Sequence, residues 1–188
     1  MWFNEKPRIC LIPLENPPEL IRFSILATKF GRILMGMVNA GQHEDAICLI
    51  YFVEKSDKET LKELRQRWPK SELLQDDKSV QSVADKLFED NKENNDVIPI
   101  AILGTEFQQS VWAALIGLKS GETCTYSQLA ERMGRPNAVR AVANAVAKNE
   151  VAILIPCHRI VSQNGATKYH WGSSLKQQLL TFESSLAN

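Results

Sequence analysis

The sequence predicts an α/β domain over residues 1–96, followed by a mostly helical domain with a helix-turn-helix over residues 97–188. Three observations support this. Apolar runs separated by turn residues dominate the chain up to about residue 53. Residues 90–96 are strongly polar and lack apolar periodicity, which is typical of a linker. From Gly104 onward, helical spacing of apolar residues prevails.

Each element of the first domain shows an apolar run or helical spacing of apolar residues. A turn-like Lys29-Phe30-Gly31 lies between the first two runs, which indicates a β-hairpin. We predict strands at residues 21–26, 33–38 and 46–53, and helices at about 58–68 and 79–89.

The second domain is predicted from capping signals. Thr105 with Gln108, and Thr125 with Gln128, have the spacing of capping boxes that begin helices. Gly134-Arg135-Pro136 is typical of a turn, and Asn137 can cap a further helix that ends near residue 148. Two short helices joined by a tight turn form a helix-turn-helix pattern. We also predict strands at residues 98–103 and 151–155.

Charge alone does not decide between a DNA-binding surface and ordinary surface charges. The net charge is zero, but residues 104–188 hold 8 basic and 5 acidic side chains, a net of +3, against 14 and 17 in residues 1–103. Residues 138–147 are nearly all small and carry a single charge, Arg140. Such a helix can pack in a core, or its backbone can approach a DNA groove closely while Arg140 reaches further.

The chain shows no secretory signal, because its N-terminus lacks a basic start followed by an apolar run. Its longest apolar stretch is far shorter than the roughly 20 residues that span a bilayer. We therefore expect a soluble intracellular protein without membrane contact. The four cysteines stand singly, so we expect no metal and no other cofactor, although Cys10, Cys48 and His43 could meet in space.

Cys157 is the candidate nucleophile. It follows Pro156 at the end of the predicted strand and precedes His158 and Arg159, whose positive charge favours a thiolate. A lone cysteine is more often a core residue. Neighbours in an extended chain point to opposite sides, so a bridging water between Cys157 and His158 is favoured over a direct bond.

Two other functions remain open. A papain-like hydrolase needs a direct Cys–His bond and an oxyanion hole, and no glycine-rich candidate for that hole accompanies Cys157. A non-enzymatic helix-turn-helix regulator or damage sensor needs neither. Alkyl transfer at carbon requires only a thiolate, a snug pocket and a proton for the leaving group.

The heptapeptide IPCHRIV at residues 155–161 closely resembles the active-site signature of the O6-alkylguanine-DNA alkyltransferase family. Residues 104–112, GTEFQQSVW, and 121–130, GETCTYSQLA, resemble especially its Ada-type members. The resemblance implies a ribonuclease H-like N-terminal domain and a C-terminal DNA-binding and alkyl-acceptor domain. It also implies a single irreversible transfer of an alkyl group from the O6 atom of a flipped guanine. The expected partner is double-stranded DNA carrying O6-alkylguanine, bound by a monomer located in the bacterial cytoplasm or the eukaryotic nucleus.

The resemblance also implies a role for individual residues. Cys157 would accept the alkyl group, His158 would activate it through water, and Glu183 would orient His158. Arg140 would enter the base stack, and Tyr126 would crowd the flipped nucleotide and assist the leaving guanine. The remaining positions are the small or polar DNA-facing residues Ala138, Ala141 and Asn144, the joining residue Asn149, the pocket-wall residues Tyr169 and Trp171, and the supporting Lys176.

The chain departs from the family pattern at three places. Glu150 stands where a proline is usual, and Asn144 replaces a smaller residue. The loop at residues 165–169 is one residue shorter than usual.

Overall fold

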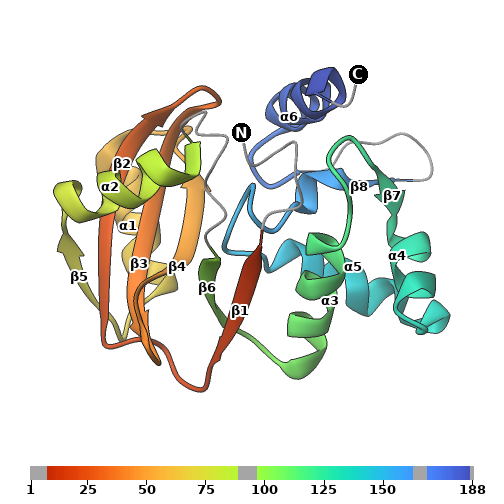
Figure 1. Cartoon of the computed structure of the whole chain (residues 1–188), viewed down its shortest axis with the longest axis horizontal. Coiled ribbons are helices and arrows are strands. Elements are labelled where there is room, and N and C mark those ends of the chain that lie inside the picture. Colours follow the sequence, from red (N-terminus) through yellow and green to blue (C-terminus); the bar gives the residue numbers. More distant parts are fainter. Residues whose placement is uncertain (1–7, 89–96, 163–168, 187–188) are drawn as a thin grey trace. The chain divides into compact units, whose positions relative to one another are not determined.

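The computed structural model describes residues 8–88, 97–162 and 169–186 (Figure 1). The chain divides into two compact units, Met1–Leu103 and Gly104–Asn188. The sequence predicted a boundary between residues 96 and 97. The difference arises because the strand at Ile98–Leu103 pairs within the sheet of the first unit.

The first unit is built on a six-stranded sheet in the order β1-β6-β4-β3-β2-β5. The central strands β2, β3 and β4 pair antiparallel, whereas β5 pairs parallel with β2, and β6 pairs parallel with β1 and β4. The elements are β1 (Ile9–Leu14), β2 (Leu20–Thr28), β3 (Gly31–Ala40), β4 (His43–Phe52), α1 (Asp57–Arg67), β5 (Glu72–Gln75), α2 (Asp77–Phe88) and β6 (Ile98–Leu103).

These elements confirm the predicted hairpin, the two predicted helices and the strands near residues 46–53 and 98–103. Strands β1 and β5 were not predicted, because β1 contains Pro13 and β5 has only four residues. A core of buried residues, including Ile21, Leu34 and Leu64, lies between the sheet and α1. At Gly36 an added Cβ would lie 2.7 Å from the Leu49 side chain, so the sheet is too tightly packed there for a larger residue.

The second unit is mostly helical, with one small pair of parallel strands, β7 and β8. Both predicted capping boxes are present, at Thr105 and at Thr125. The elements are α3 (Glu106–Ile116), β7 (Cys124–Thr125), α4 (Tyr126–Arg132), η1 (Pro136–Ala138), α5 (Val139–Ala147), η2 (Cys157–Arg159), β8 (Ile160–Val161) and α6 (Ser173–Leu186), where η marks a short 3₁₀ helix.

Two predictions for this unit were wrong. Asn137 does not cap α5, because the turn continues through η1 and Ala138 precedes α5 without a side-chain cap. Residues 151–155 are buried but form turns instead of a strand, and Ile153 adopts a φ of 70°. An apolar run predicts burial, but it does not determine the backbone conformation. Cys157 consequently lies at the start of η2, not at the end of a strand.

Some predictions fall on residues that are not described: the polar linker at 90–96, and residues 165–168 of the shortened loop. Within the described ranges, no helix has both the length and the apolar character needed to cross a membrane. Those ranges also contain no group of three or more His, Cys, Asp or Glu side chains placed to hold a metal ion. Cys10, Cys48 and His43 therefore do not form the site that the sequence left open.

Candidate active site

Cys157 is buried at the start of η2 and is held by the side chain of Asn149. The Asn149 amide donates to Sγ of Cys157 at 3.2 Å and to the Ile155 carbonyl at 2.9 Å. The Val151 N–H donates to Oδ1 of Asn149 at 2.9 Å. The buried turn at residues 151–155 is thus folded around Asn149. The hydrogen bonds of Asn149 fix the backbone of this turn and the position of Cys157.

His158 is fully buried, and its ring binds Glu183 of α6. Its Nε2 lies 2.8 Å from Oε1 of Glu183, and its Nδ1 has no hydrogen-bond partner among the described residues. Burial lowers the pKa of His158, and the hydrogen bond to Glu183 only partly opposes this. A neutral ring with its proton on Nε2 therefore leaves Nδ1 as an acceptor. In the described part of the chain no hydrogen bond joins Cys157 to His158. The prediction that Cys157 and His158 lie in an extended chain was nevertheless wrong, because both residues lie in a 3₁₀ turn.

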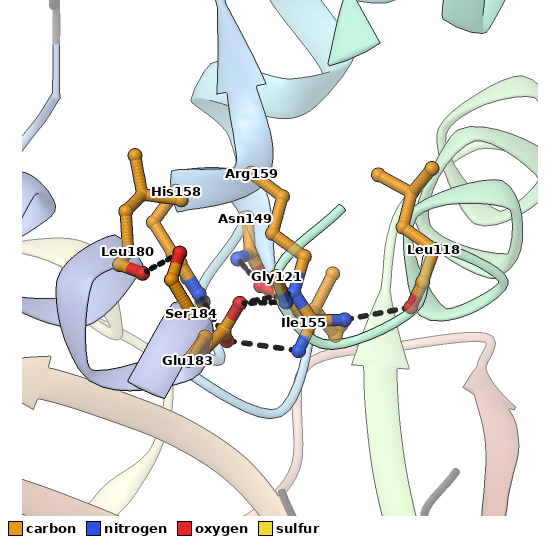
Figure 2. A network of polar contacts seen from close by, with 9 residues as sticks. All are labelled: Leu118, Gly121, Asn149, Ile155, His158, Arg159, Leu180, Glu183 and Ser184. Atoms are coloured by element: carbon orange, nitrogen blue, oxygen red, sulfur yellow. Dashed lines mark hydrogen bonds and ion pairs between the residues drawn. The ribbon is translucent and has the colours of Figure 1, made fainter. Parts of the chain in front are cut away.

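Glu183 is the centre of the buried polar network (Figure 2). Its carboxylate accepts from His158, from Nε and Nη2 of Arg159 at 2.9 and 2.8 Å, and from the Gly121 N–H at 3.2 Å. Burial by itself would raise the pKa of Glu183, but the hydrogen bonds from His158 and Arg159 outweigh it and lower the pKa to about 2. Glu183 is therefore ionised at any physiological pH.

Arg159 has a role that the sequence analysis missed. It was expected to favour a thiolate at Cys157, but its guanidinium binds Glu183 and donates from Nη1 to the Leu118 carbonyl at 2.7 Å. The cation that lowers the pKa of Cys157 is instead Lys176, which is buried and donates to the Ile160 carbonyl. Arg159 and Glu183 are 24 residues apart, and no short-range sequence pattern indicates a pairing at that distance.

The thiol is the favoured form of Cys157 in the resting protein. Burial raises its pKa, and the hydrogen bond from Asn149, the ammonium of Lys176 and the hydroxyl of Tyr169 only partly oppose this. Reaction at sulfur therefore requires removal of the thiol proton at the moment of use.

Two tyrosines lie close to the cysteine, and a tryptophan packs on one of them. Burial and then the charge of Cys157 raise the pKa of Tyr169 well above its ordinary value, and they also raise the pKa of Tyr126, which begins α4. Trp171 is buried and packs edge-to-face on Tyr169, with ring centroids 5.3 Å apart. The structure thus groups Tyr126, Tyr169 and Lys176 electrostatically with Cys157.

The residues expected to face DNA lie on the exposed side of α5 or, for Ala138, at the end of η1 just before it. Arg140, Ala141 and Asn144 are exposed and Ala138 is half-buried, whereas Val142, Ala145 and Val146 are buried. The indole N–H of Trp112 donates to the Ala145 carbonyl at 3.0 Å and fixes the buried side of α5 to α3. No described contact joins the exposed side of α5 to Cys157.

Comparison with known proteins supports a single family. The model of the 6-O-methylguanine DNA methyltransferase DNA binding domain matches residues 106–185. The bifunctional transcriptional activator/DNA repair enzyme Ada of Escherichia coli is 39% identical over 166 residues, which cover 87% of this chain and 45% of Ada. The inducible methylated-DNA–protein-cysteine methyltransferase of Bacillus subtilis is 38% identical over 122 residues, covering 63% of this chain and 68% of that protein.

A solved structure agrees with these relatives. The Mycobacterium tuberculosis O6-methylguanine methyltransferase superposes with a TM-score of 0.66 at 27% identity, covering 89% of this chain and 95% of that chain. The matched region spans about half the length of the first three curated relatives: 45% of the first two and 46% of the third.

Fold and site together define an α/β protein with a helical unit built around one buried cysteine and its His–Glu pair. The chain belongs to the methylated-DNA–protein-cysteine methyltransferase family.

Proposed function

We propose that the protein repairs DNA by direct reversal, transferring a methyl group from the O6 atom of guanine to Cys157, once per molecule. One observation carries the proposal: Sγ of Cys157 is buried against Asn149, beside a His158–Glu183 pair whose Nδ1 is still available as an acceptor. Family membership supports the same chemistry. The relatives' printed names include DNA repair enzyme and methylated-DNA–protein-cysteine methyltransferase.

The transfer is an in-line displacement at carbon. The Cys157 proton passes through a water molecule to Nδ1 of His158, and Glu183 stabilises the resulting imidazolium. Sulfur then attacks the methyl carbon, so that a C–S bond forms, the C–O6 bond breaks and the electron pair remains on guanine. Tyr126 donates a proton to the leaving guanine and regains one from solvent.

Turnover ends after one transfer, because a thioether has no route back to a thiol in this site. Asn149 and Lys176 hold the sulfur and its surroundings, and Tyr169 and Trp171 form the pocket wall. Repair is therefore stoichiometric, and excess substrate DNA leaves a plateau at one equivalent.

DNA recognition is assigned to α4, the turn and α5, acting as a helix-turn-helix in the minor groove. The half-buried Ala138 and the exposed Ala141 allow close approach, and Asn144 lies on the same side. Arg140 fills the base stack when the nucleotide rotates out. The antiparallel β2–β3–β4 sheet, extended by parallel pairing to β6, supports a ribonuclease H-like assignment for the first unit. We expect the protein to act as a monomer.

Intact mass spectrometry after incubation with DNA containing O6-methylguanine tests the proposal. The expected product carries one methyl group in place of one proton, mapped to Cys157. Cys157→Ala should abolish the mass gain but retain DNA binding. Cys124→Ala, which alters another buried cysteine of the same unit, should still gain the methyl mass. Repeated turnover would indicate a hydrolase. DNA binding without mass gain would indicate a non-enzymatic damage sensor or regulator.

A further inference from the structure

Arg159 is a buried charge for which the proposed reaction has no assigned role. Its side chain is nearly enclosed, yet all three of its nitrogens donate hydrogen bonds at 2.7–2.9 Å. A buried guanidinium is retained only when its donors are satisfied, and a planar fork on a carboxylate fixes orientation as well as charge. The geometry of this fork indicates what Arg159 does.

Arg159 and His158 bind the same carboxylate from adjacent positions of η2. Oε1 of Glu183 accepts from Nε2 of His158 and from Nη2 of Arg159, both at 2.8 Å. Oε2 accepts from Nε of Arg159 at 2.9 Å and from the Gly121 N–H at 3.2 Å. Every strong acceptor direction of the carboxylate is therefore occupied, and rotation of Glu183 would break the fork.

The same fork joins the active-site turn to the segment that precedes Tyr126. Nη1 of Arg159 donates to the Leu118 carbonyl, and Glu183 binds the Gly121 N–H three residues further on. Three chain segments, η2, α6 and residues 118–121, are thus held by one ion pair (Figure 2).

We propose that Arg159 is a positioning residue that fixes the orientation of the Glu183 carboxylate. It thereby holds His158 in the tautomer with its proton on Nε2, so that Nδ1 can accept the Cys157 proton. This inference rests on the proposed function for its catalytic consequence, but the tautomer is a property of the free protein. A tautomer with the proton on Nδ1 would present no acceptor on the side away from Glu183.

The charges around His158 support the same role for Arg159 as the geometry does. The charged groups that act on His158 are Glu183, which favours the imidazolium, and Arg159 and Lys176, which oppose it. Burial and these two cations lower the pKa of His158. Removing the charge of Arg159 while Glu183 stays ionised should therefore raise the pKa of His158.

The test is a pH titration of His158 by NMR in the free, full-length protein, with ring nitrogen shifts reporting the tautomer. His43 and His170 are assigned by substitution. The variants are Arg159→Gln and Arg159→Lys, with Arg32→Gln, which removes an exposed arginine–carboxylate pair of the first unit, as the matched control. Single-turnover methyl transfer and a melting curve are measured on each protein.

Arg159→Gln should move His158 protonation to higher pH and slow transfer about ten- to hundredfold, short of the ~10²–10⁴ that a lost general base would cost. Arg159→Lys, which keeps the charge without the fork, should titrate close to the parent and transfer at an intermediate rate. It keeps the test decisive if Arg159→Gln does not fold. Arg32→Gln should change neither readout.

A slower Arg159→Gln with an unchanged His158 titration and tautomer would overturn the proposal, because a merely structural arginine gives that result. If the parent protein were not methylated while its His158 titration still responded to Arg159, the repair function would fail and the positioning role would stand.

Discussion

The two units of the chain differ in whether they bury charged side chains. In the first unit the ion pairs Arg32–Asp57 and Lys55–Glu63 lie at the surface, with every one of these side chains more than half exposed. Among the described residues, all buried Asp, Glu, His, Lys and Arg side chains lie in the second unit. They are His158, Arg159, Lys176 and Glu183, joined there by the buried amide of Asn149.

This contrast separates stability from function. A sheet unit stabilised by apolar packing needs no buried charge, and its buried polar residues, Ser24, Thr60 and Ser71, are neutral. Burying a charge costs roughly several kcal/mol, and hydrogen bonds and opposite charges must offset that cost. A second unit that keeps four such groups together around one cysteine therefore has a chemical use for them.

The strongest way to break the comparison is Glu183→Gln. The change leaves Arg159 buried without its anion, so we expect a loss of about 3–5 kcal/mol in the free energy of unfolding. Methyl transfer should also slow, because Gln cannot stabilise an imidazolium. Urea unfolding and single-turnover rates measure the two effects. A loss below about 1 kcal/mol is the range of exposed ion pairs, and it would contradict a buried, ionised Arg159–Glu183 pair.

Acid unfolding tests the same carboxylate without mutation. The pKa of Glu183 is about 2 in the folded protein, against about 4.3 for an unperturbed glutamate. A lowered folded pKa gives stability that is present above the unfolded pKa and is lost as pH falls through the folded one. We expect about 3 kcal/mol to be lost between pH ~4.3 and ~2. The free energy of unfolding at several pH values should show a shallower decline in Glu183→Gln, and equal slopes would contradict the assignment.

Trp171→Gly tests whether an apolar wall, and not the charges, limits substrate size. Trp171 is buried against Tyr169, so a benzyl group beside Cys157 would overpack the site by about 1–3 kcal/mol. We expect efficient methyl transfer but slow reaction with free O6-benzylguanine, which the variant should accelerate by about one to two decades. A melting curve controls for lost packing. Fast benzyl transfer by the parent protein would refute a crowded pocket.

Arg140→Ala concerns an exposed charge of the second unit. Because Arg140 is exposed, its loss should leave the melting temperature unchanged. Flipping a base costs a few kcal/mol, so repair of duplex DNA should slow by about tenfold, and transfer from a free modified base much less. Rates on the two substrates decide this. Equal losses on both substrates would show that Arg140 supports the fold and does not act in base flipping.

Glu63→Gln should produce the smallest effect. The Lys55–Glu63 pair lies on the surface of the first unit, where solvent screens the charges. We expect no measurable change in melting temperature or methyl transfer. A clear change in either would show that exposed charges of the first unit are not neutral to function.

The sequence alone determined the features that depend on neighbouring residues. The capping boxes at Thr105 and Thr125 involve partners three residues away, and the β2–β3 hairpin is defined by its own turn. The segment around Cys157 could likewise be identified as the reactive motif, because its residues are contiguous. Strand β1 was missed because Pro13 interrupts its strand pattern.

Tertiary structure decided the parts that depend on distant partners. The apolar run at residues 151–155 predicted burial, but its turn conformation follows from the hydrogen bonds of Asn149. Arg159 looked like an activator of the adjacent Cys157, yet it binds Glu183, 24 residues away. A charge in a buried site goes to the partner that satisfies most of its donors, and only the folded chain determines which partner that is.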